Sequence, residues 1–320
     1  MAGGVRRDDF TEAMKRDSYQ YFWEAYEQKA PVYENIFDVV ESNSSYEKFT
    51  TAIGMGDLVE KPEGEDLQAD APMEGYTVIC KNRTFGRVAR FSKESIEDSQ
   101  KSNLIQQAVS SWGKAYLRTK EKFYAKFFNY GAMTAGNDVF NNTIANVIDD
   151  PTGNLIYDNK PFFSTAHPDK VGNTYSNYSA SNSLTETNLR SVYLTMTSTN
   201  NRDERGNVVE ISIDTLLIPP ALKFTAQVLL NSTLIPGSAD NDVNVLRGLV
   251  NPVEWSYLSD TDGWFLGKAK EGLMATNRQD PIIDSFQDEI SLDYFITINC
   301  RYGGVVTNWR FWYANAIASS

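Results

Sequence analysis

Two amphipathic segments dominate the first half of the chain. Apolar residues that approximate one stripe of a helix predict a helix over residues 8–29, which Pro31 ends. A broader apolar stripe predicts a second helix over residues 102–131, with Ser102 able to cap its start and Gly131 able to end it. At about 1.5 Å per residue, this second helix is a rod on the order of 45 Å long.

A long polar excursion, residues 44–98, separates the two predicted helices. Residues 57–74 carry seven acids against one base, whereas residues 81–93 carry five bases and no acid. Strand-favouring residues on both sides predict an extended hairpin with an acidic limb and a basic limb. Such a segment buries little of itself. It is therefore a solvated loop, an arm that docks on another chain through complementary charge or, as a weaker alternative, a nucleic-acid site on the basic limb.

The second half of the chain has the pattern of a regular α+β region. Residues 135–182 are rich in turn-forming residues. Helical spacing over residues 184–198 is followed by alternation typical of a strand over residues 208–218. Pro219 and Pro220 then open another helix, because proline is tolerated in a first turn. Residues 251–258 and 263–269 are predicted to form two strands joined by the SDTD turn (259–262), and late strands are predicted over residues 294–300 and 308–316.

Composition narrows the possible functions. The net charge of −12 argues against tight nucleic-acid binding over the whole chain. The sequence has no apolar run of the roughly 20 residues that a membrane span needs, and no apolar stretch of a secretory signal near its start. Cys80 and Cys300 form neither a disulfide framework nor a zinc pattern. We expect a soluble, intracellular, folded protein.

The sequence predicts no catalytic, cofactor or metal site. It contains one histidine, His167, and no phosphate-binding loop, dinucleotide fingerprint or nucleophile elbow. Ser164 is too close in sequence to His167 for the usual pairing of nucleophile and base, so a structural histidine is the favoured interpretation. Asp260 and Asp262 match only a fragment of a calcium loop and indicate a solvated turn.

The excursion and the rod cannot both bury their faces within one compact globule. Packing between subunits is therefore predicted as the main role of the surface. We expect the basic limb to meet carboxylates of a neighbouring copy, and the acidic limb to meet the basic face of the rod. The residues predicted to make these contacts are Arg83, Arg87, Arg90, Glu63, Glu65, Asp66, Lys114, Arg118 and Lys122.

Three segments, in this order, resemble the major capsid proteins of tailed bacteriophages, and most of all the family of the Mu-type major head subunit. They are PFFSTAHP (161–168), IDTLLIPPALKFTAQVLL (213–230) and NPVEWSYLSDTDGWFLG (251–267). The resemblance implies the α+β Hong Kong 97-type capsid fold. It also implies five regions: an N-terminal arm with a helix (1–43), an extended E-loop hairpin (44–98), a spine helix with the first part of the peripheral (P) domain (99–144), an axial (A) domain (145–275) and C-terminal strands returning to the P-domain (276–320).

The resemblance further implies a structural protein without enzymatic activity or cofactor. Many copies would assemble as hexamers and pentamers into an icosahedral head around double-stranded DNA, without sequence-specific binding and without a membrane. Portal, scaffolding and decoration proteins are the other expected partners. The expected location is the virion, after assembly in the host cytoplasm.

The sequence leaves three alternatives open. An encapsulin-like compartment would share the fold and load a cargo enzyme instead of DNA. A tail or sheath protein would form tubes instead of closed shells. A hydrolase that uses paired carboxylates is the alternative from another class, against which the single histidine and the long charged excursion argue.

Overall fold

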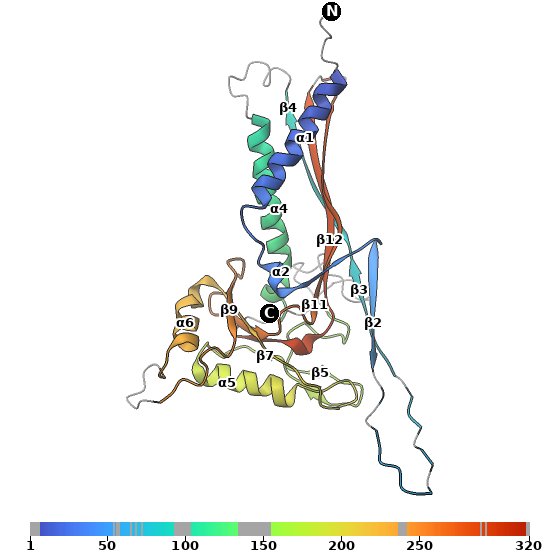
Figure 1. Ribbon diagram of the computed structural model, residues 1–320, viewed down its shortest axis with the longest axis vertical. Coiled ribbons are helices and arrows are strands. Elements are labelled where there is room, and N and C mark those ends of the chain that lie inside the picture. The colour runs from blue at the N-terminus through green and yellow to red at the C-terminus, as the bar shows by residue number, and fades with distance from the viewer. Residues whose placement is uncertain are drawn as a thin grey trace, which may run out of the picture.

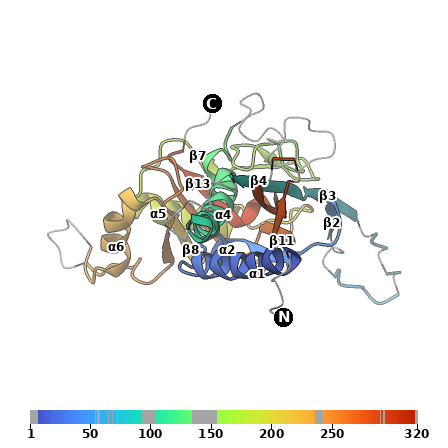
Figure 2. The ribbon, with the colours of Figure 1, turned by 90° about the horizontal axis from the view of Figure 1, so that it is seen from above.

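The computed structural model describes residues 7–53, 55, 58–64, 66, 67, 69–71, 73–92, 104–133, 155–235, 242–288, 290, 291 and 293–317. Figure 1 shows three parts: a tall stem of helices and long strands, a broad base beneath it, and a hairpin that extends downward beside the base. The view from above in Figure 2 places the hairpin on one side of the molecule and helix α6 on the other.

The stem is built on a four-stranded sheet in the order β1-β11-β12-β4. The long strands β11 and β12 run antiparallel, β4 adds antiparallel to β12, and β1 adds parallel to β11. Alternate residues of β12 are buried, among them Ile296, Ile298 and Cys300, as expected for a strand with one covered face. The stem strands are β1 (Asp38–Glu41), β4 (Arg83–Phe91), β11 (Leu273–Gln287) and β12 (Tyr294–Val306).

Two helices cover this sheet, α1 (Arg7–Tyr26) and α4 (Leu104–Asn129), with the short α2 (Tyr33–Ile36) leading from α1 into β1. Gly113 lies where α4 crosses α1. A Cβ atom at this position would clash with the backbone of Phe22, so the close crossing requires glycine. The two predicted helices are therefore confirmed, and they pack on each other within one chain.

An aromatic core continues from the stem into the base. Tyr33 stacks on Tyr124 of α4 with ring centroids 4.5 Å apart. One turn further along α4, Phe128 contacts Phe265 and Trp312 of the base sheet at 5.0 and 5.1 Å. Because the lower end of α4 is buried among base residues, stem and base share one hydrophobic core.

The base is a five-stranded sheet in the order β7-β13-β10-β8-β9, with helices α5 and α6 beside it. A second, smaller core packs Leu189 of α5 and Leu230 of α6 against Leu216 and Leu266 of the sheet. The base elements are β5 (His167–Pro168), β6 (Thr174–Tyr175), β7 (Tyr178–Ser179), α5 (Glu186–Leu194), the π-turn Thr195–Thr199, β8 (Thr215–Ile218), the 3₁₀ turn Pro220–Leu222, α6 (Lys223–Asn231), β9 (Asn251–Glu254), β10 (Trp264–Gly267), the 3₁₀ turn Trp309–Phe311 and β13 (Trp312–Asn315).

The hairpin consists of β2 (Tyr46–Ile53) and β3 (Met73–Lys81) only. The prediction of one hairpin over residues 44–98 is wrong for the basic limb, because β4 leaves the hairpin and joins the stem sheet. Asn82 makes this transition. Its side chain donates to the hydroxyl oxygen of Ser42 at 2.7 Å and accepts a hydrogen bond from Thr276 at 2.7 Å.

Three strand predictions also need correction. The strand predicted over residues 208–218 begins only at Thr215. The two predicted strands on either side of the SDTD turn, β9 and β10, do not pair, because β8 lies between them. The final strand, β13, does not return to the stem with its neighbours in residues 276–320 but enters the base sheet between β10 and β7.

Candidate assembly surfaces

A groove of about 840 Å³ runs along α4, between the helix and the β4–β12 edge of the stem sheet. Three basic side chains line it: Arg87 from β4, and Lys114 and Arg118 from successive turns of α4. All three residues are exposed. The remaining wall is largely aromatic and aliphatic, with Phe85, Trp112, Tyr116, Ile298 and Tyr302. We call this the α4 groove.

The α4 groove joins two basic clusters that the sequence placed on separate elements. In β4, alternate residues face the same side of the sheet, so Arg87 shares a face with Phe85, which contacts Phe123 of α4. Lys114 and Arg118 are four residues apart, so they lie on one face of the helix. Lys122 is exposed one turn further along α4 and does not line the groove.

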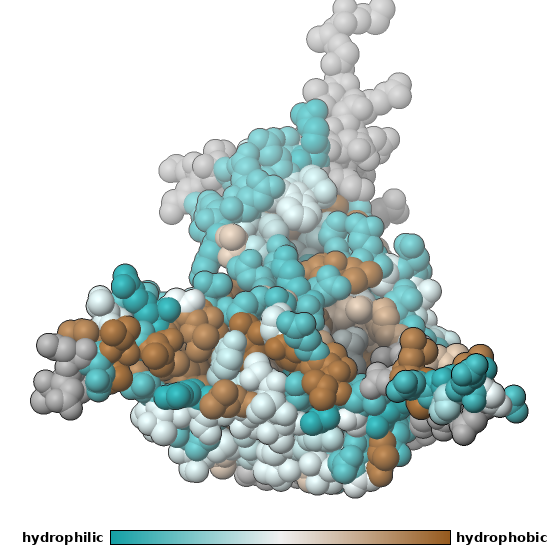
Figure 3. Space-filling model, turned by 60° about the horizontal axis from the view of Figure 1, so that its bottom comes forward, coloured by the Kyte–Doolittle hydropathy of each residue, from teal (hydrophilic) through white to brown (hydrophobic). Residues whose placement is uncertain are grey.

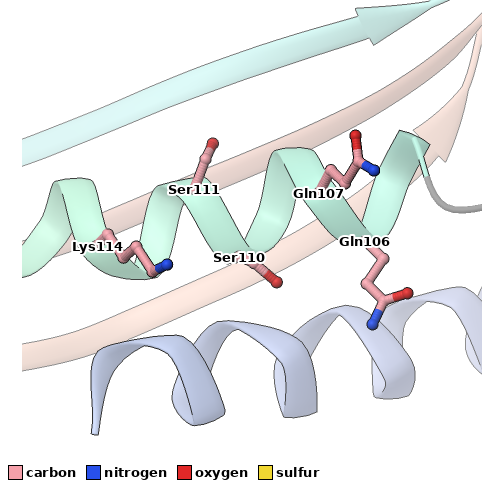
Figure 4. A pocket seen from close by; sticks show the side chains of 5 residues that line it. All are labelled: Gln106, Gln107, Ser110, Ser111 and Lys114. Carbon is pink, nitrogen blue, oxygen red and sulfur yellow. The ribbon is translucent and has the colours of Figure 1, made fainter. Parts of the chain in front are cut away.

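A shallow polar hollow of about 400 Å³ extends the groove toward the start of α4 (Figure 4). Ser111 and Lys114 line both the hollow and the groove, so the two are continuous. In Figure 4, Gln106 points toward α1, whereas Gln107 and Ser111 point toward the strands. The continuous surface therefore offers amide and hydroxyl groups at one end and positive charge with apolar walls at the other.

The other two predicted arginines of β4 do not line the α4 groove. Arg90 donates to Asp293 from Nε at 2.6 Å and from Nη2 at 2.5 Å, and Asp293 is nearly fully buried. Arg83 is half-buried, and this burial lowers the pKa of its guanidinium. Of the three β4 arginines, Arg87 is therefore the one that lines the groove and is available to a partner.

The described residues of the acidic limb before Met73 lie in the loop between β2 and β3. Glu60, Glu63 and Asp66 are exposed, whereas Glu65 lies outside the described residues. Leu58, Val59 and Leu67 lie in the same loop, and their side chains are also among the exposed large hydrophobic ones. In Figure 1 this loop is at the bottom of the molecule, far from α4, the helix that lines the groove. The tip thus combines negative charge with apolar side chains that its own subunit does not cover.

A third surface, which the sequence did not predict, is apolar and lies on the base. Phe224 and Val228 of α6, with Leu234, Val243 and Val245 after it, are all exposed. Figure 3 shows apolar side chains gathered on the side of the base that carries α6. The signal that could have found it is the composition of α6, in which apolar residues occupy both faces of the helix.

His167 is structural. It is fully buried, stacks on Trp309 with ring centroids 4.2 Å apart, and its Nδ1 lies 2.5 Å from Asp158 Oδ2. Asn177 donates its amide group to three backbone carbonyls, so its oxygen accepts from His167 Nε2 at 3.0 Å. Both ring nitrogens are therefore occupied by hydrogen-bond partners within the protein. No solvent-facing base is left for hydrolytic chemistry at this position.

Metal and thiol chemistry receive no support from the described residues. Within them, no group of three or more His, Cys, Asp or Glu side chains could hold a metal ion. Cys80 and Cys300 are buried free thiols, and burial raises the pKa of each to about 11. Among the described helices, none has the length and apolar character that crossing a bilayer requires.

Comparison with known proteins identifies this architecture. A family model described as phage capsid protein matches residues 75–315. The capsid of cyanophage P-SCSP1u aligns with a TM-score of 0.55 at 13% identity, over 91% of this chain and 89% of that one. The mature capsid of bacteriophage PhiM1 gives 0.58 at 9% identity, over 91% and 88% of the chains. The capsid of an empty GTA particle gives 0.54 at 12% identity, over 88% of each.

No curated protein matches the chain in sequence. At identities this low, the solved structures show the fold alone, and they agree with the mixed helices and sheets described above. The family match is the stronger evidence, because it spans most of the chain, from the return strand of the hairpin to the final strand of the base. The chain therefore belongs to the phage capsid protein family and is a major capsid protein of the Hong Kong 97-type fold, as the sequence resemblance predicted.

Proposed function

We propose that this capsid protein forms the icosahedral head of a tailed phage around double-stranded DNA, and that the hairpin tip of one subunit docks in the α4 groove of the next. The docking rests on the observation that a single chain carries both an acidic, apolar hairpin tip and a basic, apolar groove. Because the two lie far apart in the subunit, a second copy is the natural partner for each.

The docking assigns complementary roles to the residues on each side. Leu58, Val59 and Leu67 of the tip would cover the apolar wall of the groove. Glu60, Glu63 and Asp66 would meet Arg87, Lys114 and Arg118. Each exposed ion pair contributes only about 0–1 kcal/mol, so the charges set the register of the contact more than its strength. The closed shell repeats the contact many times, which makes a weak contact durable.

The regions implied by the capsid resemblance are proposed to fall on the observed parts as follows. The N-terminal arm contains α1, the E-loop is the β2–β3 hairpin, and α4 is the spine helix. The stem sheet belongs to the P-domain, now with β4 included, and the base belongs to the A-domain, now with β13 included. In this arrangement the bases of neighbouring subunits meet around the five-fold and six-fold centres of the shell.

The remaining expectations are part of the same proposal. The protein acts structurally, without enzymatic activity or cofactor. Its net charge of −12 keeps packed DNA from adhering to the wall, since like charges repel. Portal, scaffolding and decoration proteins would complete the particle, which is assembled in the host cytoplasm and ends as the virion shell.

Electron microscopy of the purified protein tests the proposal. Wild-type subunits are expected to form closed shells, whereas Arg87→Glu, Lys114→Glu and Arg118→Glu together should leave mostly unassembled subunits, because the groove then repels the acidic tip. Arg190→Glu, an exposed charge reversal on α5 outside the groove, is the matched control and should assemble normally. Tubes, or shells filled with a protein cargo, would contradict the DNA-head function, and normal shells from the triple variant would contradict the docking.

A further inference from the structure

One arginine anchors the hairpin to the base of its own chain. Arg205 Nη1 donates to both carboxylate oxygens of Asp70, at 3.0 and 3.3 Å, and Nη2 donates to the carbonyl oxygen of Ala71 at 2.6 Å. Asp70 and Ala71 lie just before β3, where the loop returns from the tip. A planar guanidinium that bonds a carboxylate and a neighbouring carbonyl fixes the direction of a segment as well as its position.

The loop that carries Arg205 is itself held firmly. Asp203 Oδ1 accepts from the backbone N–H groups of Arg205 and Asn207, each at 2.8 Å, which closes a tight turn. Gly206 completes this turn with a φ of +85°, in the left-handed region that favours glycine. Glu204 accepts from Arg310 at 2.7 Å in a nearly buried ion pair. Arg205 is therefore mounted on a rigid part of the base.

A second contact holds the same side of the hairpin. The ring of Tyr76 in β3 lies 4.9 Å from that of Tyr157, and Lys170 Nζ lies 4.6 Å from the centre of the Tyr76 ring. Both this contact and the Arg205 bonds are made by the return side of the hairpin. The hairpin is thus held along β3 and at the loop end of its paired strands, while the tip with Leu58 and Leu67 stays exposed.

We propose that Arg205 is a positioning residue for shell assembly, because its clasp on Asp70 and Ala71 sets the angle at which the hairpin leaves the unassembled subunit. The assembly role rests on the proposed docking of the tip on a second copy. A pre-oriented arm loses less conformational freedom on docking than a loose one. A fixed angle also places the tip of each subunit at a defined position relative to the next, which makes Arg205 a determinant of shell curvature.

The angle can be measured in unassembled subunits held at a concentration below that of assembly. Spin labels on Leu67→Cys at the tip and Leu194→Cys at the end of α5 would report the tip-to-base distance, since both positions are exposed. The native cysteines stay unlabelled, because both are buried and the pKa of each is raised to about 11. The variants are Arg205→Ala, Arg205→Lys and Asp70→Asn. Arg190→Ala serves as the matched control, and Arg205→Asp with Asp70→Arg as the rescue.

We expect Arg205→Ala and Asp70→Asn to broaden the distance distribution and to lower the yield of uniform shells several-fold. Arg205→Lys should behave similarly, because one ammonium cannot span both partners. The swapped pair restores the ion pair but not the bond to the Ala71 carbonyl. It should therefore narrow the distance distribution and raise the shell yield relative to Arg205→Ala, while the Arg190→Ala control should match the wild type. An unchanged distance distribution in Arg205→Ala would overturn the clasp, and broadened distances with normal, uniform shells would overturn its role in assembly. Wild-type subunits that form no shells would contradict the proposed function, while the distances would still decide the clasp.

Discussion

At the residue scale, α4 carries two adjacent buried charges with different surroundings. The Lys120 ammonium lies 4.9 Å from the ring centre of Tyr116 and 5.4 Å from that of Tyr302, and burial lowers its pKa. Glu121 accepts from the backbone N–H of Val32 at 2.5 Å and from the indole N–H of Trp255. Glu121 therefore ties α4 both to the segment after α1 and to the base.

Burial raises the pKa of Glu121 above its ordinary value of 4.5 despite these hydrogen bonds. The folded state then holds a proton on Glu121 more tightly than the unfolded state does. The stability that this proton contributes is complete below the unfolded pKa and is lost as pH rises through the folded pKa. We therefore expect the wild type to lose stability relative to Glu121→Gln as pH rises above about 4.5. Chemical denaturation of subunits at a series of pH values measures it.

The matched control is Glu24→Gln, an exposed carboxyl on α1 whose side chain accepts from Gln20 at 2.8 Å. Its unfolding free energy should follow that of the wild type across the same pH range. A Glu121→Gln curve parallel to the wild-type curve would show that burial does not govern the protonation of Glu121.

At the scale of elements, the contact between α1 and α4 depends on Gly113. Alanine favours a helix by about 1 kcal/mol over glycine, so an exposed position would gain stability from Gly→Ala. Here the added methyl group would meet the Phe22 backbone, and the helices would have to move apart. We expect Gly113→Ala to destabilise the subunit by about 1–3 kcal/mol, as overpacking does. Thermal or chemical denaturation measures the change.

Ser111→Ala, an exposed substitution two residues away on α4, is the matched control and should change stability by less than about 0.5 kcal/mol. If Gly113→Ala is as stable as the wild type, α1 can move away from α4 without a loss of stability. The helix crossing would then not be tightly packed.

The elements differ in how well the sequence predicts them. The helices α1 and α4 were predicted because apolar residues recur along each of them at approximately helical spacing. The strand β11 was not, because Pro281 interrupts its alternation, and the structure accommodates the proline at a register shift between Gln279 and Ile282. The position of β4 was also missed, since its pairing with β12 is made across about 200 residues of chain, beyond the reach of local pattern.

At the scale of the whole molecule, the sequence predicted the charged surfaces better than their arrangement. Arg87 and Lys114 were both expected to contact a neighbour, but only the fold shows that they line one groove. Conversely, Arg90 looks equivalent to Arg87 in sequence, yet it faces the opposite side of β4 and reaches Asp293. The anchoring of the hairpin by Arg205 had no sequence signal, because Arg205 and Asp70 are 135 positions apart.

If the tip docks in the groove of a second copy, reversing the charges on both sides of the contact together should restore assembly. Glu60→Lys, Glu63→Lys and Asp66→Lys together should block assembly, because a basic tip is repelled by the basic groove. Combining them with Arg87→Glu, Lys114→Glu and Arg118→Glu restores opposite charges in every contact. The variant with all six substitutions should therefore form shells again. The defect of the tip variant should be largest at low salt, since screening shortens the range of repulsion to about 10 Å at 0.1 M ionic strength. Sedimentation measures the fraction of subunits in shells. If the variant with all six substitutions assembles no better than either triple variant, the tip contacts some other surface.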